Sequence, residues 1–439
     1  MTTHRSRRRV HIAVASVVTL ALIATACGDD EEGTATEPPG SEAPGPTDVA
    51  ETTAAPDTTA APDTTAAPDT TAAPDTTDPS ATTAGPDGSA PAAECDTPDE
   101  VSLQLQWVTQ AQFGGYLAAV EQGFYEDMCL NVEIVEGGPD IVPQQQLADG
   151  AVEFAIAWVP KALASREAGA DIVNIAQIFQ RSGTLQVAFA DSGIASPADF
   201  EGKKIGNWGF GNEYEIFAAL GEADLDPAQD VELVAQQFDM NGLLNGDIDA
   251  AEAMTYNEYA QVLEAENPDT GELYTPEDLS VISYEDVGVG MLQDAIWADG
   301  AKLESDEAYR DIAVRFVAGS IQGWAYCRDN VEACRDVVVD AGSQLGNSHQ
   351  LWQMNEVNKL IWPAQGGIGV IDEAAWNRTV EIAQNTSNLE GATVLTEAPS
   401  EGSFTNDVVN EALEMLGDSV DTTGEGFEPI EVTVEAGGA

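Results

Sequence analysis

The stretch LQLQWVTQAQFGGYLAAVEQGFY, residues 103–125, decides the fold. Its first part alternates apolar and polar residues, which predicts a strand that ends at the aromatic residue Trp107. A polar turn follows at residues 109–112, and two glycines then open an apolar-periodic helix that we expect over residues 114–127. Open α/β sheets build small-molecule sites where a strand delivers a side chain to such a loop. Spacing alone leaves a core position for Trp107 equally open.

Strand and helix signals alternate along the rest of the chain, and this alternation predicts an α/β fold with parallel strands. The roughly 345 residues after the N-terminal region are too many for one core, so we expect two lobes. Two extended segments, QVAFAD at 186–191 and VGVGMLQDAIW at 287–297, are predicted to cross between the lobes. Helices are expected at residues 306–327 and 332–341, and the C-terminal residues 405–434 are expected to form one more helix and an extended tail.

Two further phrases extend the pattern, EQGFYEDMCLNVEIVEGGPD at residues 121–140 and ADGAVEFAIAW at residues 148–158. With them the chain resembles, from about residue 101 to residue 386, the periplasmic-binding-protein family of the thiamine-pyrimidine-precursor binders, the riboflavin binders and the thiamine pyrimidine synthases. The resemblance implies a two-lobe type II periplasmic-binding-protein fold of the α/β class. Such a fold has a hinge and an interlobe cleft that holds the ligand.

We divide the chain into six segments on this basis. They are a lipoprotein signal peptide (1–26), a disordered Pro/Thr/Ala/Asp-rich stalk (27–94), the first part of lobe 1 (95–190), lobe 2 (191–290), the second part of lobe 1 (291–400), and a C-terminal helix and tail (401–439).

The N-terminal segment carries an export signal. Four arginines precede a nearly continuous apolar run at residues 10–23, and small residues then precede Cys27. A cysteine at this place resembles a bacterial lipobox, in which the thiol is lipidated, so we expect an extracytoplasmic protein held to the cell membrane by lipid. The alternative is an uncleaved anchor, although the run is shorter than the roughly 20 residues of a spanning helix. The repeat AAPDTT over residues 54–77 cannot form a core and is expected to be a disordered stalk.

The sequence is strongly acidic, with a formal net charge of −61 at pH 7. Such a surface repels nucleic acid and anionic lipid headgroups, so neither is expected as a partner. Acidic solvation in a salty habitat is the simplest explanation of the charge. The scarcity of Lys and Arg also opposes long-range attraction of an anionic ligand.

Four cysteines follow Cys27, and an even number of cysteines in an exported protein indicates disulfides. Cys327 and Cys334 flank a short turn and are expected to pair, which leaves Cys95 to pair with Cys129. Six residues between cysteines is not a zinc-binding spacing, and no metal site is expected.

The resemblance places ligand contacts at the strand ends that face the cleft. Trp107 matches a tryptophan that stacks on a flat heterocycle in the pyrimidine binders, and Trp158 ends another strand, with a core position as its alternative. The turn NWGFGNEYE, residues 207–215, matches a Gly-rich turn whose carboxylate, here Glu213 or Glu215, accepts a hydrogen bond from an exocyclic amine. The alternative for either glutamate is to complement the helix dipole from the first turn. The expected ligand-binding residues are Trp107, Gln112, Tyr116, Trp158, Trp208, Gly209, Gly211, Glu213, Tyr214, Glu215, Tyr256 and Asn257.

Three polar residues precede the first crossover: Arg181, Ser182 and Thr184. They are expected either to bind a polar end of the ligand or to brace the hinge.

Catalysis is not expected. The synthases draw pyrimidine atoms from a histidine in the loop after the first strand, and this chain has Phe113 there. Their cysteine-rich motif is missing as well, and His349 has no obvious partner in the sequence. The sequence therefore gives no reason to expect a cofactor.

These observations predict a lipid-anchored solute-binding component of an ABC importer, which captures a flat heteroaromatic small molecule and delivers it to the permease and ATPase subunits. A thiamine pyrimidine precursor is the first choice of ligand, and riboflavin or another vitamin-like ring is the second. One alternative is a thiamine pyrimidine synthase that uses pyridoxal phosphate and iron. The others are a nitrate-, sulfonate- or taurine-type binding protein, and a surface receptor or adhesion module without a transport role.

Overall fold

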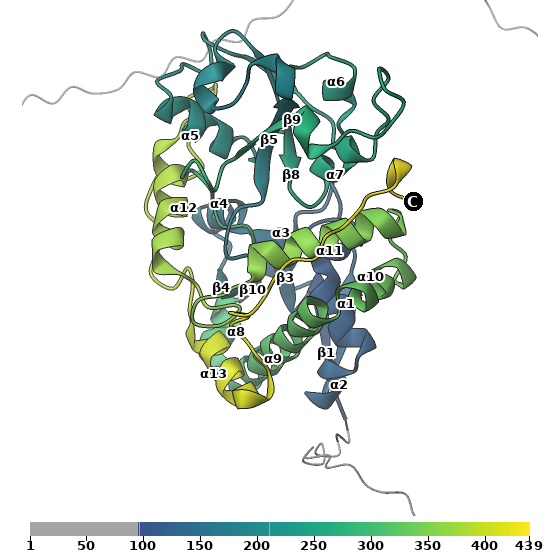
Figure 1. Cartoon of the computed structure of the whole chain (residues 1–439). Helices are drawn as coiled ribbons and strands as arrows, with labels where there is room; N and C mark the ends of the chain where they lie inside the picture. The colour runs from purple at the N-terminus through teal and green to yellow at the C-terminus, as the bar shows by residue number, and fades with distance from the viewer. Residues whose placement is uncertain (1–94, 96, 210) are drawn as a thin grey trace, which may run out of the picture. The chain divides into compact units, whose positions relative to one another are not determined.

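The computed structural model describes residue 95, residues 97–209 and residues 211–439 (Figure 1). The predicted signal peptide, the stalk and the lipid-carrying Cys27 lie outside the described residues. None of the helices within the described range combines the length and the hydrophobicity needed to cross a bilayer.

The first of two sheets has five strands in the order β2-β1-β3-β10-β4 (Figure 1). These strands are β1 (Asp99–Gln104), β2 (Leu130–Val135), β3 (Phe154–Trp158), β4 (Ile172–Gln177) and β10 (Asp294–Asp299). The central strand β3 is buried over its first four residues, as expected for a continuous apolar run inside a sheet. Because β1 ends at Gln104, Trp107 lies in the loop that follows the strand rather than at its last position.

The second sheet also has five strands, in the order β7-β6-β8-β5-β9. They are β5 (Thr184–Phe189), β6 (Lys204–Asn207), β7 (Glu232–Ala235), β8 (Ala250–Met254) and β9 (Leu279–Ser283). We call the first sheet with its helices the first lobe, and the second sheet with its helices the second lobe.

The prediction of parallel strands is wrong for the two strands that cross between the lobes. β10 runs antiparallel to β3 and β4, and β5 runs antiparallel to β8 and β9. In each sheet, the strands of the βα units have their carboxyl ends at the edge that faces the other lobe. A strand that comes from the other lobe enters the sheet at this edge, so it runs in the opposite direction. Asp294, the first residue of β10, is therefore paired with Trp158, the last residue of β3. The segment 186–191, predicted as an extended crossover, is extended but lies mostly within the second sheet as part of β5 (Thr184–Phe189).

The helix predicted over residues 114–127 is interrupted. It divides into α1 (Gly114–Glu121) and α2 (Phe124–Asp127), because Gly123 between them has a left-handed backbone with φ of 77°. A short 3-10 turn, η1 (Ala111–Phe113), precedes α1.

The other helices cover the two sheets and connect them. They are α3 (Pro143–Ala148), α4 (Val159–Glu167), α5 (Tyr214–Glu222), α6 (Asn241–Leu244), α7 (Glu258–Leu263), α8 (Gly300–Ser305), α9 (Glu307–Asp329), α10 (Val331–Asp340), α11 (Asn347–Ile361), α12 (Glu373–Asn385) and α13 (Asp407–Leu416). The bounds of α9 and α10 agree closely with the predicted segments, and α13 is the helix expected within residues 405–434, but α11 and α12 were not predicted. Asp306 caps α9 by accepting hydrogen bonds from the backbone N–H groups of residues 308 and 309.

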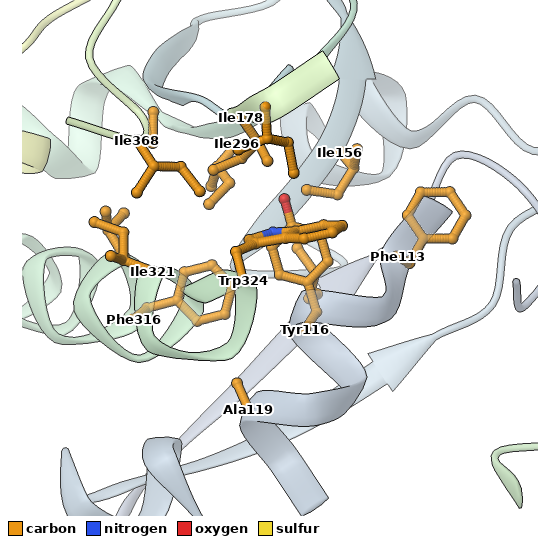
Figure 2. Packing of buried hydrophobic residues seen from close by; sticks show 14 of the residues in the cluster. Phe113, Tyr116, Ala119, Ile156, Ile178, Ile296, Phe316, Ile321, Trp324 and Ile368 are labelled. Atoms are coloured by element: carbon orange, nitrogen blue, oxygen red, sulfur yellow. The ribbon is translucent and has the colours of Figure 1, made fainter. Parts of the chain in front are cut away.

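The main core of the first lobe forms where α1 and α9 pack on each other beneath the sheet. Figure 2 shows Tyr116 of α1 beside Trp324 of α9, with Ile156 and Ile296 of the sheet above them. Gly115 permits this contact, since a Cβ atom there would lie 2.2 Å from the Trp324 ring. Close packing of core side chains against the start of α1 therefore explains the two glycines there.

Both predicted disulfides form. Cys95 pairs with Cys129 and Cys327 pairs with Cys334, with Cα–Cα distances of 5.6 and 5.1 Å. The second bridge joins the end of α9 to the start of α10 across the turn at Asn330.

Two elements outside the sheets contact both lobes. Helix α12 packs on α4 of the first lobe and on α5 of the second (Figure 1). Helix α11 contacts η1 of the first lobe and α7 of the second. The extended C-terminal tail runs along α11: Ser348 Oγ accepts a hydrogen bond from the backbone N–H of residue 435 at 2.7 Å.

Candidate functional site

The two lobes meet where the strands of their βα units end. We call this region the junction and define it by Trp107, Trp158 and Asp294 on the first lobe and by Trp208, Glu252 and Tyr256 on the second. Trp107 and Phe238, from different lobes, contact each other directly, with ring centroids 4.9 Å apart.

A buried carboxylate, Asp294, organises the first-lobe side of the junction. Its oxygens accept hydrogen bonds from Gln106 Nε2 at 2.5 Å, Trp158 Nε1 at 2.8 Å and Gln112 Nε2 at 3.0 Å. Burial raises the pKa of the Asp294 carboxyl to about 7, although these three hydrogen bonds act in the opposite direction. The network fixes two predicted residues, Gln112 and Trp158, in one place.

Lys161 brings one positive charge to the junction from the first turn of α4. Its Nζ atom lies over the Trp158 ring, 5.0 Å from the centroid. Burial lowers the pKa of the Lys161 ammonium, against the attraction of Glu252, Glu213 and Asp294. Two of these three carboxylates belong to the second lobe, so Lys161 lies between the lobes.

Glu252 is the corresponding carboxylate of the second lobe. It lies in the middle of β8, is fully buried, and accepts a hydrogen bond from the backbone N–H of Trp208 at 2.7 Å through Oε2. Its other oxygen, Oε1, is buried and has no hydrogen-bond partner among the described residues. Burial raises the pKa of Glu252 well above its usual range, and the nearby Glu215, Glu213 and Glu258 act in the same direction. An acceptor is thus held at the junction with nothing bonded to it.

Aromatic rings surround these charges. Phe238 makes an edge contact with Trp107 and lies 5.9 Å from Trp208 between ring centroids. Trp208 is almost fully buried, and its indole N–H has no hydrogen-bond partner among the described residues. Tyr256 packs on Phe179. The junction therefore combines flat apolar surfaces with buried polar groups, as small-molecule sites do.

The two predicted glutamates of the Gly-rich turn lie in different surroundings. Glu213 precedes α5, accepts a hydrogen bond from the backbone N–H of Gly211 at 2.8 Å, and is close enough to Lys161 to affect its pKa. Glu215 is buried and accepts a hydrogen bond from the backbone N–H of Met291 at 2.6 Å, so it fixes the segment that returns to the first lobe. Burial raises the pKa of Glu215 to about 7.

The glycines of this turn both have left-handed backbones, with φ of 66° at Gly209 and 86° at Gly211. A Cβ atom at Gly211 would lie 3.9 Å from Lys161 Cε, so the turn approaches the lysine. Tyr214 is directed elsewhere: it packs on Phe217, and the nearby Glu390 contributes to its raised pKa after burial and Glu213.

Asn257 belongs to a different polar cluster. Its Oδ1 atom lies 2.9 Å from His349 Nε2, and His349 Nδ1 lies 2.9 Å from Glu264 Oε1. The interpretation that His349 has no partner is therefore wrong: the histidine joins α11 to α7, two elements too far apart in sequence for spacing to pair them.

The three polar residues before the first crossover are hydrogen-bonded within the protein, as expected if they brace the hinge. Arg181 donates hydrogen bonds to the backbone oxygens of residues 359, 362 and 363 at the end of α11. Ser182 accepts from the backbone N–H of Thr184, and its own N–H donates to Glu285.

Sequence reasoning missed Asp294, Glu252 and Lys161. Each had a visible signal: a carboxylate at the start of a buried strand, a single charged residue in AAEAM, and a lysine three residues after the tryptophan of β3. A charged residue within an apolar strand has to be bonded or functional, because burying it alone is costly. No group of three or more His, Cys, Asp or Glu side chains suited to a metal ion occurs in the part of the chain that the structure describes.

A sequence model of the family described as NMT1/THI5 like matches residues 110–333, about half of the chain. The chain belongs to the NMT1/THI5 like family. The matched region includes Gln112, Trp158, Glu252 and Asp294, so it contains residues from both sides of the junction, whereas Trp107 lies before its first residue.

Three relatives are similar over parts of the chain. A Haemophilus influenzae protein named for thiamine biosynthesis is 25% identical over 190 residues, which cover 43% of this chain and 60% of the relative. The formylaminopyrimidine-binding protein of Halalkalibacterium halodurans is 23% identical over 246 residues, 55% of this chain and 70% of the relative. The 4-amino-5-hydroxymethyl-2-methylpyrimidine phosphate synthase of Legionella pneumophila is 26% identical over 127 residues, 29% of this chain and 40% of the relative. The first of these alignments thus spans less than two thirds of the relative.

Among solved structures, the periplasmic aliphatic sulphonate binding protein SsuA from Escherichia coli superposes with a TM-score of 0.50 at 14% identity. The superposition covers 76% of this chain and 94% of that chain. At this identity the likeness concerns the fold alone, and it confirms the two-lobe periplasmic-binding-protein fold predicted from the sequence.

Proposed function

We propose that this chain is the solute-binding component of an ABC importer and that it binds a flat amino-substituted heterocycle at the junction. A thiamine pyrimidine precursor is the preferred ligand. The chain would capture it outside the cytoplasm, anchored by lipid on Cys27, and deliver it to a permease with ATPase subunits.

The observation that carries this proposal is the buried, unbonded Oε1 atom of Glu252, whose other oxygen accepts a hydrogen bond from the backbone N–H of Trp208. A carboxylate oxygen in a dry site needs a hydrogen-bond donor, and an exocyclic amine is a donor carried by a flat ring. Trp107 and Trp208 offer the faces on which such a ring can stack.

The charge of the junction argues against an anion. Asp294, Glu252 and Glu213 contribute three carboxyl groups, whereas Lys161 contributes one ammonium group. A sulfonate or nitrate placed there would add a negative charge to a site that already contains unpaired acceptors. The names of the relatives, formylaminopyrimidine binding in one and thiamine biosynthesis in another, support the same ligand class.

Calorimetry on the purified full-length protein tests the proposal. Formylaminopyrimidine and 4-amino-5-hydroxymethyl-2-methylpyrimidine are expected to bind, and an alkanesulfonate is not. Binding should also raise the melting temperature, because the ligand binds only the folded protein. Binding of the sulfonate with no binding of either pyrimidine would reject the proposed ligand class and support the anion-binding alternative.

A second candidate function is pyrimidine synthesis, which the Legionella pneumophila relative favours. Phe113 stands where the synthases carry their histidine, and its side chain is fully buried in the first-lobe core. We therefore expect no pyrimidine product when the protein is incubated with pyridoxal phosphate and iron(II). Formation of a pyrimidine phosphate that depends on the protein would establish the synthase instead.

A further inference from the structure

Helix α11 carries a glutamine whose amide is buried without any partner. Gln353 is 0% exposed, and neither its Oε1 nor its Nε2 atom has a hydrogen-bond partner among the described residues. Its neighbour Gln350 has an unpartnered Nε2 as well. Burying these polar atoms is costly, because each loses the hydrogen bond that it makes to water in the unfolded chain and gains none in the folded protein.

The position of Gln353 on α11 places it between the two lobes. Gln350, three residues before, accepts a hydrogen bond from the backbone N–H of Ala111 in the first lobe at 2.6 Å. Glu356, three residues after, accepts one from Thr255 Oγ1 in the second lobe at 2.9 Å. Three residues correspond to about 60° around an α-helix, so Gln353 lies between the face that contacts one lobe and the face that contacts the other.

Other groups at the junction lie in the same neighbourhood. Asp294 raises the pKa values of both Tyr116 and Tyr256, after the larger effect of burial, so the two hydroxyls are close to this carboxylate. Tyr116 lies shortly after Ala111, which is hydrogen-bonded to Gln350. Tyr256 directly follows Thr255, which is hydrogen-bonded to Glu356. The segments bonded by Gln350 and Glu356, one turn to either side of Gln353, thus lead to two tyrosines whose hydroxyls are near Asp294.

We propose that the Gln353 amide binds the edge of the ligand ring by a paired donor and acceptor. The proposal rests on the function proposed above and deepens it. A primary amide with both atoms free matches a heterocycle edge on which a ring nitrogen stands beside an exocyclic amine, as glutamine matches the edge of adenine. Glu252 would then accept a hydrogen bond from the ligand. Gln353 would bind only a ligand edge on which an acceptor stands next to a donor. This selects an aminopyrimidine edge over a ring without that pair.

The test is the substitution Gln353→Met, which keeps the length of the side chain and removes both polar atoms. Affinity for 4-amino-5-hydroxymethyl-2-methylpyrimidine should fall about tenfold to a hundredfold, because two hydrogen bonds to the ligand are lost. The melting temperature of the ligand-free variant should stay the same or rise, because an unpartnered amide has been replaced by an apolar group. If Gln353 had only a structural role, the substitution would lower the melting temperature and leave the affinity unchanged.

Gln322→Met is the matched control. Gln322 on α9 also has a buried, unpartnered Oε1, but it lies two residues, about 200° around the helix, from Trp324, which faces Tyr116. This variant should bind the pyrimidine like the wild type. Gln353→Glu provides a second variant of similar size: it keeps an acceptor, lacks the donor, and should also lose affinity.

The outcomes separate the two proposals. If the wild type binds the pyrimidine and both Gln353 variants bind it equally well, the role of Gln353 is wrong and the proposed function stands. If Gln353→Met lowers the ligand-free melting temperature by several degrees while Gln353→Glu retains affinity, the amide is a structural group held by water. If the wild type binds neither pyrimidine, both proposals fail.

Discussion

In the first lobe, Ile156 of β3 is paired with Ile296 of β10. The matching position of the second lobe pairs Glu252 of β8 with Gln186 of β5. Both sheets have the same arrangement of strands: the strand that crosses between the lobes, β10 in the first and β5 in the second, is the fourth of five in the order. The topology therefore does not require a polar interior, and the second lobe carries its buried carboxylate for another reason.

The helices that follow the first βα strand of each sheet, α1 after β1 and α5 after β6, differ in the same way. The second residue of α1 is Gly115, which admits the Trp324 ring. The second residue of α5 is Glu215, which is buried and bonded to the backbone of Met291. The first lobe uses this place for apolar packing, whereas the second uses it for a charged group that holds the return crossing. Apolar packing and buried carboxyl groups are thus distributed unequally between these matching places of the two lobes.

The largest effect is expected where the first lobe is apolar. Ile156→Ala should lower the free energy of unfolding by about 2–5 kcal/mol, because Ile156 is fully buried against Ile296 and the Trp324 cluster (Figure 2). Urea denaturation measures this change. Val281→Ala on β9, where the side chain is 39% exposed, serves as the control and should cost well below that range. An equal loss in both variants would show that the first-lobe core is not the main source of stability.

The next effect concerns pH and the second lobe. The pKa of Glu215 is about 7 in the folded protein, whereas an unfolded glutamate titrates near 4.3, so the folded state binds an extra proton between these values. The free energy of unfolding contributed by this group therefore falls as pH rises from about 4 to about 7, by roughly 3–4 kcal/mol. Glu215→Gln keeps an acceptor for Met291 and removes the titration. Urea denaturation at pH 4 and pH 8 should show a smaller decrease for the variant, and an unchanged decrease would contradict the assignment.

Glu252→Gln tests the polar position directly. The amide keeps an acceptor for the backbone N–H of Trp208 but places an NH2 donor where the carboxyl offers the ligand amine an acceptor, so affinity for the aminopyrimidine should fall by about 1.5–3 kcal/mol. Because burial raises the pKa of Glu252, the folded state disfavours its charged form, and the variant should be at least as stable as the wild type at pH 8. Calorimetry and thermal denaturation measure the two quantities. Loss of stability without loss of affinity would make Glu252 a structural residue.

The sequence predicted the features that depend on local patterns. The strand at residues 154–158 and the helix near residues 306–327 follow from local hydrophobic patterns, and the two disulfides follow from the number and spacing of the cysteines. The direction of β5 and β10 could not be predicted this way, because it depends on where a chain enters a sheet from the other lobe. The same holds for Asp294, whose partners Gln106 and Trp158 lie 188 and 136 residues away. Residues brought together only by the crossing strands leave no periodic signal.

The smallest expected effect is at the aromatic contact that joins the lobes. Trp107→Ala should weaken binding of the aminopyrimidine by about 1–3 kcal/mol, through lost stacking and lost apolar burial. Phe238→Ala is the matched variant, since Phe238 touches Trp107 from the second lobe and is itself 43% exposed. If Trp107 stacks on the ligand, its loss should exceed that of Phe238 in calorimetry. If Trp107 only closes the two lobes on each other, the two variants should lose the same affinity, and the double variant should lose no more than either single one. That result would move the stacking surface to Trp208, on the polar second lobe.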